Sequence, residues 1–421
     1  MKQVKTYDCG VRLINEFNPS NKTVNISFSV ASGSGFDLPQ KEGIAHYFEH
    51  MFFKSTKKRN TKNLLQEMDF LGGFNNAYTS YDRTSYYGKV INEDAEQFFE
   101  ILSDCFFNGE FKEEEMETEK GVVCSEIDKY EDDFMDCNQD ALYKELFKGT
   151  NYSHPVLGSK SSVMSITSDD LKEYRRKNNG PGKLIVSVFG GIPFEKADEF
   201  VQKYVIPNYH TKEEPVFYKN SQIKLPQTEK RVVTTEKDTK QVYFIASRPT
   251  IRMDNPDYMK IQIASAIFGG TMSSRLFERM REKEGIVYYV GSYITTLPMC
   301  GNHFVSFITE RGTAERAIKA YYDEVQKIIN DGFTEKEFQN AIHMFKTNLL
   351  MKEDDVSVKF VREATNYLYD GFVEETEDLI EKVCSLKLDD INKTFINLLK
   401  QESAISLVLK DKNDSLLKLI K

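Results

Sequence analysis

The chain has 421 residues, a length that exceeds what a single ordinary core organises, so we expect at least two domains. Hydrophobic residues make up 40% of the chain and charged residues 29%, a balance that is typical of globular proteins and excludes a disordered chain. The formal net charge of -9 excludes nucleic acid as the main partner, because phosphate binding needs a basic face and no stretch supplies one.

The sequence also lacks the features of exported and membrane proteins. The segment before Val24 has no apolar core of signal-peptide length, and no window approaches 18 uninterrupted apolar residues. The six cysteines are scattered without a Cys-x-x-Cys pair, which predicts neither a disulfide framework nor a thiolate zinc site. We therefore expect a cytoplasmic protein that makes no membrane contact.

The first half of the chain predicts a mixture of strands and helices. Alternating apolar residues predict a half-buried strand at Val24 to Val30, and the apolar run Leu184 to Val188 predicts a buried one. Between them we expect a helix from near Gly43, a helix at Leu64 to Leu71 that Gly72 and Gly73 end, strands at Asn76 to Ser80 and Thr84 to Ile91, a helix at Glu93 to Phe107, and one long or two successive helices at Lys112 to Lys148.

A proline-bearing segment with little apolar periodicity separates the halves, and we place a linker at 211–228. After it the order of elements recurs: a strand at Gln241 to Ser247, helices at Asp257 to Phe268 and Ser274 to Glu282, strands at Val287 to Thr295 and His303 to Thr309, further helices, and a last strand near Ala404 to Leu409. The sequence therefore predicts an α+β protein of two similar halves, 1–210 and 229–421, that arose by duplication.

The segment GIAHYFEHMFFKST carries the strongest chemical signal. In a helix, His46 and His50 lie on one face, so both imidazoles reach one metal ion at about 2.0 to 2.1 Å. Glu49 lies on the same side, where a carboxylate accepts a proton from the attacking water as a general base and does not bind the metal. A surface helix with two solvated histidines would give the same pattern, although the chain has only six histidines.

A catalytic zinc site takes a third protein ligand from elsewhere in the chain. The helical segment Glu115 to Asp132 offers Glu119 and Glu126, which lie two turns apart and therefore on one face. Most acids of this segment must be solvated surface charges, and spacing alone does not choose between the two.

With these motifs in view, the sequence resembles the pitrilysin/insulinase family of zinc peptidases, which includes the mitochondrial processing peptidase and insulin-degrading enzyme. In that family the third ligand is a glutamate that follows the second histidine by roughly three-quarters of a hundred residues. Another functionally important glutamate lies seven residues before this ligand. In TEKGVVCSEIDKYE, Glu126 lies 76 residues after His50, with Glu119 seven before Glu126. The resemblance implies that His46, His50 and Glu126 bind one zinc ion per chain. It makes Glu119 an acid that orients or tunes the site.

The resemblance also implies residues that contact a peptide substrate. The stretch GGFNNAYTSYDRTSYY is similar to the family's glycine-rich turn and edge strand, so Asn76 and Ala77 are candidates for binding the peptide as an added strand. An ordinary hairpin is the alternative. The stretch FGGTMSSRLFERMREKEGIVYYVGS resembles the segment whose arginine and tyrosine reach the scissile region from the facing half, here Arg281 and Tyr288. As isolated residues, both could be structural.

Large single-chain members of the family form a clamshell and are roughly twice as long, so this chain corresponds to one half of it. That half consists of two similar α/β sandwiches, each a mainly antiparallel sheet with helices packed on it. Because this chain carries both the zinc motif and the Arg281 and Tyr288 segment, a homodimer would complete the site.

The function that the resemblance implies is a zinc-dependent endopeptidase that degrades or trims unfolded peptides. Zinc would act with Tyr288 or Arg281 on the oxyanion, and Glu49 would pass its proton to the leaving amine. Two alternatives remain: a catalytic subunit that needs a different partner chain, and a non-enzymatic peptide-binding or structural relative. The stretch FGGTMSS is shorter than the glycine-rich loop of the non-catalytic subunit of the mitochondrial processing peptidase, which disfavours a role as that inactive partner. Lys54-Ser55-Thr56 stands where many relatives have a central glycine.

Overall fold

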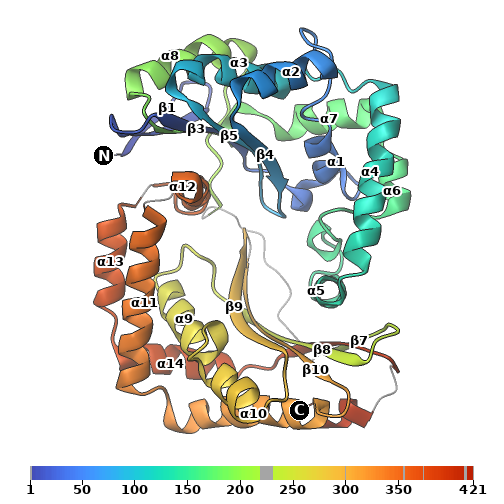
Figure 1. The fold of residues 1–421 in the computed structure, drawn as a ribbon, viewed down its shortest axis with the longest axis vertical. Helices are drawn as coiled ribbons and strands as arrows, with labels where there is room; N and C mark the ends of the chain where they lie inside the picture. Colours follow the sequence, from blue (N-terminus) through green and yellow to red (C-terminus); the bar gives the residue numbers. More distant parts are fainter. Residues whose placement is uncertain are drawn as a thin grey trace. The chain divides into compact units, whose positions relative to one another are not determined.

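The computed structural model describes residues 2–218, 231–298, 300–353, 356–372, 374–411 and 415–420 (Figure 1). Contacts divide the chain into two compact units. The first comprises Met1–Lys129, Thr150–Lys219 and Lys352–Glu375, and the second comprises Tyr130–Gly149, Asn220–Met351 and Thr376–Lys421. Each unit contains one sheet with helices packed on it, so the α+β class predicted from the sequence is confirmed.

The first unit is built on a six-stranded sheet. Its strands are β1 (Lys2–Thr6), β2 (Arg12–Phe17), β3 (Thr23–Val30), β4 (Phe74–Thr79), β5 (Thr84–Ile91) and β6 (Leu184–Gly190), in the order β1-β2-β6-β3-β5-β4. Its longer helices are α1 (Ile44–His50), α2 (Thr61–Leu71), α3 (Ala95–Asn108), α4 (Glu113–Glu131), α7 (Ser168–Asn178), α8 (Phe194–Tyr204) and α12 (Val356–Asp370).

Residue alternation along β3 explains how helices cover both faces of this sheet. The apolar row that includes Phe28 faces α3, where Phe28 meets the rings of Phe99 and Phe106 at centroid distances of 5.2 and 5.6 Å. The opposite face, which carries Ser29 on β3 and Arg12 on β2, lies against α12. The strand predicted at Val24 to Val30 is therefore confirmed, but the prediction that it is half-buried is wrong, because α3 covers one face and α12 the other.

The second unit repeats the topology of the first. Its strands are β7 (Val232–Glu236), β8 (Gln241–Thr250), β9 (Tyr289–Leu297), β10 (Cys300–Glu310) and β11 (Ala404–Leu409), in the order β7-β11-β8-β10-β9. Its longer helices are α5 (Phe134–Leu146), α9 (Tyr258–Ser265), α10 (Ala314–Asp331), α11 (Glu335–Glu353), α13 (Thr376–Cys384) and α14 (Leu388–Leu399).

The two sheets share one strand order. Taken in chain order, the five strands from β2 to β6 occupy the same places in their sheet as the five from β7 to β11. In each described sheet the first and last of these five pair in parallel, and the other pairs are antiparallel. The mainly antiparallel sheets and the similarity of the halves are therefore confirmed at the level of topology.

Each half of the chain supplies a helix to the other unit. Helix α5 packs on the second sheet, where Asn138 donates to the main-chain oxygens of Tyr243 and Ser406 at 3.1 and 3.4 Å. Helix α12, drawn in orange in Figure 1, packs on the first sheet. The predicted boundaries, 1–210 and 229–421, stay a prediction, and the contact units differ from them at these two helices. Of the predicted linker 211–228, residues 219–228 lie outside the described residues.

Of the two alternatives predicted for Lys112 to Lys148, the structure has two successive helices, α4 and α5. Other elements differ from the sequence prediction. The predicted helices near Phe268 and Arg281 contain π-helical segments, Ala266–Gly270 and Phe277–Lys283. Strands β1, β2 and β7 were not predicted. No helix among the described residues is both long and apolar enough to cross a membrane.

A buried histidine lies in the core of the second unit. His303 on β10 is fully buried, its Nε2 lies 2.8 Å from the Ser292 hydroxyl, and its ring meets Phe395 edge-on at 5.3 Å. Burial, followed by the charge of Arg248, lowers the pKa of His303 to about 3. The folded protein therefore holds this imidazole in its neutral form near neutral pH.

Acid should destabilise the protein through His303. Between pH 6.5 and about 3 the unfolded chain binds a proton that the folded chain does not, so the free energy of unfolding falls as the pH drops. The slope is roughly 1.4 kcal/mol per pH unit for one such group. Urea unfolding across this range should give a flatter profile for His303→Asn than for wild type. The exposed control, His154→Asn, should keep the wild-type slope; equal slopes for both variants would contradict this assignment.

Candidate metal centre

A glycine and a buried acid set the start of helix α1, which carries the metal motif. Gly43 has φ of 86°, and a Cβ at this position would meet the Leu157 main-chain oxygen at 2.4 Å, so glycine is required there. The Asp37 carboxylate accepts hydrogen bonds from the amides of Gly43 and Ala45 at 2.7 and 3.0 Å. Burial raises the pKa of Asp37, although these two bonds oppose the rise. The start of α1 is thereby fixed.

Helix α1 is held against α4 by its buried face. Tyr47 is fully buried, and its hydroxyl donates to the Met116 main-chain oxygen at 2.7 Å. Phe48, one residue further, meets the rings of Phe111 and Tyr174 at 5.4 Å each. These contacts fix the rotation of α1, so that His46 and His50 lie near Glu126 on α4.

The structure brings the three predicted ligands together. The Oε2 atom of Glu126 on α4 lies 3.7 Å from His46 Nε2 and 3.2 Å from His50 Nε2. All three donor atoms lie within 4.8 Å of one another. Within the part of the chain that the structure describes, these residues form the one cluster of histidine, cysteine and acidic side chains with the spacing of a metal site.

These distances fit a zinc ion. Tetrahedral zinc with bonds of about 2.0 to 2.1 Å places its ligand atoms about 3.3 Å apart, close to both distances from Glu126. Two imidazoles and one carboxylate are also a common ligand set of catalytic zinc, which leaves a fourth position for another molecule. The residues present therefore fit zinc.

Glu119 contacts the predicted ligand His50 from outside the cluster of three. Its Oε1 lies 2.9 Å from His50 Nδ1, and its Oε2 forms an ion pair of 2.5 Å with Lys54. Burial alone would raise the pKa of Glu119, but the hydrogen bonds of His50 and Lys54 lower it. A carboxylate on Nδ1 fixes the imidazole orientation and leaves Nε2 for a metal. The contact suits an acid that orients the site, and the role of Glu119 stays a prediction.

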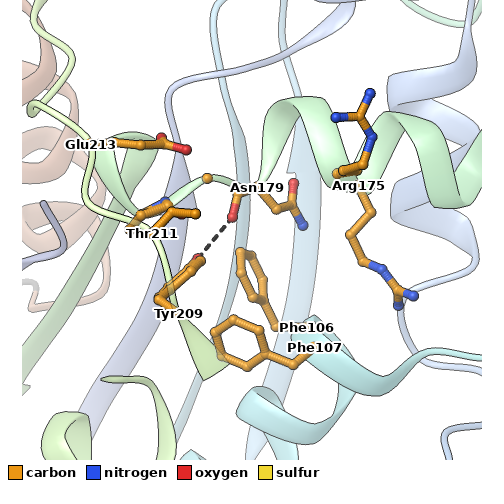
Figure 2. A pocket seen from close by; sticks show the side chains of 10 residues that line it. Phe106, Phe107, Arg175, Asn179, Tyr209, Thr211 and Glu213 are labelled. Carbon is orange, nitrogen blue, oxygen red and sulfur yellow. Dashed lines mark hydrogen bonds between the residues drawn. The ribbon is translucent and has the colours of Figure 1, made fainter. Parts of the chain in front are cut away.

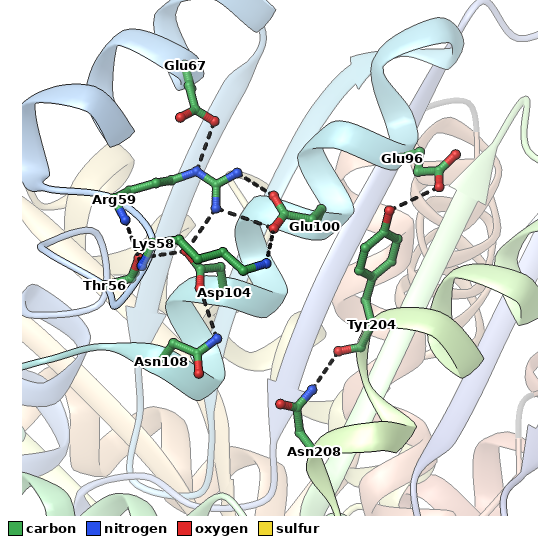
Figure 3. A network of polar contacts seen from close by, with 10 residues as sticks. All are labelled: Thr56, Lys58, Arg59, Glu67, Glu96, Glu100, Asp104, Asn108, Tyr204 and Asn208. Atoms are coloured by element: carbon green, nitrogen blue, oxygen red, sulfur yellow. Dashed lines mark hydrogen bonds and ion pairs between the residues drawn. The ribbon is translucent and has the colours of Figure 1, made fainter.

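The segment that follows α1 is tied to its neighbours by charged groups (Figure 3). Arg59 pairs with Glu67, Glu100 and Asp104 at 2.9, 2.5 and 2.8 Å, and Thr56 donates to Asp104 at 2.6 Å. Although burial opposes it, these bonds raise the pKa of Arg59. The network fixes the loop that carries Lys54, and therefore the distance from Lys54 to α4.

Glu49 lies beside the ligands but is held by a different element. The Thr79 hydroxyl on β4 donates to Glu49 Oε2 at 2.6 Å. Among the described residues, no side chain or amide donates to Oε1 of Glu49. Burial raises the pKa of Glu49, and the Thr79 bond and the charge of His50 limit the rise. A carboxylate with a raised pKa and one oxygen left for water is suited to general-base chemistry.

The two histidines have opposite pKa shifts. Burial, followed by the charge of His50, lowers the pKa of His46 to about 3, so this imidazole is neutral and able to bind a metal. Burial alone would lower the pKa of His50, but the hydrogen bond and charge of Glu119, with the other nearby carboxylates, raise it. The rings lie 4.6 Å apart and at 65° to each other.

The predicted substrate strand is an edge strand in the structure. Strand β4 ends the described order of the first sheet and pairs only with β5. Ser80 N–H donates to the Arg83 carbonyl at 2.8 Å. In an antiparallel pair every second residue forms such hydrogen bonds, so the main-chain groups of Ala77 and Thr79 point away from β5. Asn76 faces β5 with its main chain, and its side chain accepts from Ala77 N–H at 2.9 Å.

Arg281 and Tyr288 lie together in the second unit. The Arg281 guanidinium donates to the Tyr288 main-chain oxygen and faces the Tyr288 ring at 5.6 Å. The Tyr288 side chain is 73% exposed, so it is not a core residue. Their contact with a substrate stays a prediction.

A separate cavity of about 210 Å³ lies elsewhere in the first unit (Figure 2). Phe106, Arg175, Asn179 and Glu213 are among the residues that line it, and Tyr209 donates to the Asn179 main-chain oxygen at 2.8 Å. No residue of the metal centre lines this cavity. The centre is therefore defined by its ligands and not by this cavity.

Three residues of the centre were not predicted from the sequence: Asp37, Lys54 as a partner of Glu119, and Thr79. Lys54 lies beside the motif, but the sequence assigns it no role. A capping acid before Gly43 could have been inferred from helix-start rules. The Thr79 contact depends on how β4 packs against α1, which sequence spacing does not reveal.

Comparison with known proteins gives two family matches. The model described as Insulinase (Peptidase family M16) matches residues 12–160, and the model described as Peptidase M16 inactive domain matches residues 165–345. The first match contains all three proposed ligands and Glu49. The second contains Arg281 and Tyr288.

Relatives match over nearly the whole chain or over one half. The Bacillus subtilis protein named Uncharacterized zinc protease YmxG is 29% identical over 96% of this chain and 98% of its own length. The Arabidopsis thaliana protein named probable mitochondrial-processing peptidase subunit beta is 32% identical over 48% of this chain and 38% of its own length.

Two solved structures share the fold. A protease from Helicobacter pylori has a TM-score of 0.88 at 18% identity and covers 97% of this chain and 99% of its own. A peptidase M16 inactive domain from Pseudomonas fluorescens has a TM-score of 0.85 at 16% identity, with 97% of each chain covered. At these identities the likeness shows the fold alone.

Metal affinity should separate the predicted ligand Glu126 from its neighbours on α4. Glu119→Gln should weaken zinc binding about 10- to 100-fold because it loosens His50, and Glu126→Gln should weaken it further because it removes a ligand. Glu117→Gln, an exposed change on the same helix, should bind zinc like wild type. Competition with a zinc-binding dye measures all four proteins; equal affinities for wild type and Glu126→Gln would show that Glu126 is no ligand.

Proposed function

Because the chain belongs to the insulinase family of peptidases, peptidase family M16, we propose that it is a zinc-dependent endopeptidase that hydrolyses unfolded peptides. The names of its relatives, which include zinc proteases and a processing-peptidase subunit, support a peptidase role. We propose one zinc ion per chain, bound by His46, His50 and Glu126.

The observation that carries this proposal is the position of Glu49. It lies one residue before the ligand His50, yet β4 holds its Oε2 through Thr79 and so keeps it out of the ligand set. Zinc, when bound, would supply a Lewis acid that polarises a carbonyl and lowers the pKa of water. Glu49 Oε1 would accept a proton from the attacking water and then deliver it to the nitrogen of the leaving amine.

The other site residues orient the reaction in this proposal. Glu119 holds His50 through Nδ1 and keeps the imidazole aimed at the metal position. The outward main-chain oxygen of Ala77, and the side chain of Asn76 that accepts from Ala77 N–H, would bind the peptide backbone as an added strand beside β4. Binding through the main chain favours extended, unfolded peptides of varied sequence.

The proposed assembly is a homodimer in which Arg281 and Tyr288 of one subunit complete the zinc site of the other. Both side chains are exposed, and they contact each other on one segment, which suits a shared role at a substrate. The proposed location is the cytoplasm, where the six free thiols stay reduced. A catalytic subunit that needs a different partner chain is the alternative.

Replacing the proposed base should abolish turnover without removing zinc. Glu49→Gln keeps the shape and the Thr79 contact but cannot accept the proton, so the cleavage rate should fall at least 10²- to 10⁴-fold, on the order expected for a general base. Cleavage of a quenched, unstructured peptide and zinc content are measured together, with Glu117→Gln as the control. A Glu49→Gln protein that cleaves at the wild-type rate would refute the role given to Glu49.

Subunit complementation tests the homodimer. Glu49→Gln and the double variant Arg281→Ala, Tyr288→Phe should each be inactive. Co-expressed, they form mixed dimers in which one site combines an intact Glu49 with intact facing residues, so about a quarter of wild-type activity should return. No recovery in isolated mixed dimers would contradict the shared site; recovery only on addition of another protein would favour a different partner chain.

A further inference from the structure

The turn that joins β4 to β5 contains a buried acid, Asp82, that is held from outside the hairpin. Asp82 is 4% exposed, and its Oδ2 accepts a hydrogen bond from the Tyr369 hydroxyl at 2.7 Å. Its Oδ1 accepts from Ser80 at 2.5 Å, and Arg83 forms an ion pair with it at 3.1 Å. The Tyr218 hydroxyl donates to the main-chain oxygen of Asp82. Both the side chain and the main chain of Asp82 are therefore held by tyrosines from outside the turn.

The two tyrosines come from segments far apart in the sequence. Tyr369 lies on α12, and Tyr218 precedes the stretch that leads into the second half of the chain. Both segments are fixed to the first sheet by the fully buried Arg12, which donates to the Val216 main-chain oxygen at 2.8 Å. Its guanidinium faces the rings of neighbouring residues in both segments, at 5.3 and 5.9 Å. The donors to Asp82 are therefore rigidly placed.

The anchored turn is adjacent to the catalytic apparatus. Thr79, the last residue of β4, holds Glu49 and directly precedes the turn. Arg83 at the other end of the turn donates to the Tyr78 hydroxyl at 2.8 Å. Because β4 pairs with β5 alone in the described sheet, no second strand steadies it. Its position depends on the hairpin, on its contact with α1 and on the groups that fix the turn.

We propose that Asp82 is a positioning residue for peptide binding, and that the Tyr369 and Tyr218 hydroxyls fix it so that β4 presents its outer edge to the peptide. The three residues form what we call the Asp82 clamp. The part of this proposal that concerns peptide binding rests on the proposed function, because it assumes that the peptide binds along β4. The part that concerns how well β4 is ordered is independent of the proposed function.

The chemistry of the clamp makes each hydroxyl matter. Burial, followed by the charge of Asp82, raises the pKa of Tyr369, so the hydroxyl keeps the proton that it donates. A carboxylate that is buried and loses a donor is left undersatisfied, which is more costly than losing a surface bond. The turn should then rearrange, and β4 should move with it.

The test compares Tyr369→Phe with Tyr367→Phe. Both remove one hydroxyl from buried tyrosines of α12, but only Tyr369 donates to Asp82. Hydrogen exchange of the β4 and β5 amides should be about tenfold faster in Tyr369→Phe and unchanged in Tyr367→Phe. With zinc bound, Tyr369→Phe should raise KM for a quenched, unstructured peptide about tenfold, with a smaller change in kcat, because strand addition is weakened.

A second variant distinguishes loss of the contact to Asp82 from a general folding defect. Tyr218→Phe removes the other hydroxyl and should change exchange and KM in the same direction, at an unchanged circular dichroism spectrum. If both Tyr369→Phe and Tyr218→Phe match Tyr367→Phe in exchange and in KM, the Asp82 clamp has no positioning role. If wild type cleaves no peptide, the proposed function fails, while the exchange comparison still decides whether the clamp orders β4.

Discussion

The site depends above all on how α1 is docked against α4. Two histidines one turn apart need a third protein ligand to complete a site for one metal ion. The candidate for that ligand, Glu126, lies on a helix that begins more than sixty residues later in the chain. The buried Tyr47 contact to Met116 and the cap by Asp37 set the rotation and the start of α1. With these fixed, Glu119 and Glu126, two turns apart, reach His50 at its two nitrogens.

The position of β4 also depends on contacts with other elements. An edge strand is needed for a peptide to add to the sheet, yet an edge strand has a partner on one side only. In the first unit, the exchanged helix α12 supplies Tyr369 to the end of that strand, and Thr79 connects the strand to Glu49. The repeated topology of the second unit places β9 at the corresponding edge of its own sheet.

Much of this could be predicted from sequence because strong periodicity and spacing are local. The strand at Val24 to Val30 and the pair His46 and His50 follow from alternation and from helical geometry. Glu126 could be chosen over other acids only through the family resemblance. Local sequence does not encode the tertiary contacts on which several features depend: the short strands β1 and β7, the π-helical segment that contains Arg281, and the packing of α5 and α12 in the unit of the other half of the chain.

The central claim is that His46, His50 and Glu126 together hold zinc. The most direct measurement is X-ray absorption at the zinc edge on the purified protein, combined with anomalous diffraction from its crystals. The account predicts one zinc ion per chain, bound by two imidazole nitrogens and one carboxylate oxygen, with an anomalous peak between α1 and α4. Zinc bound by sulfur, or a peak away from His46 and His50, would contradict it.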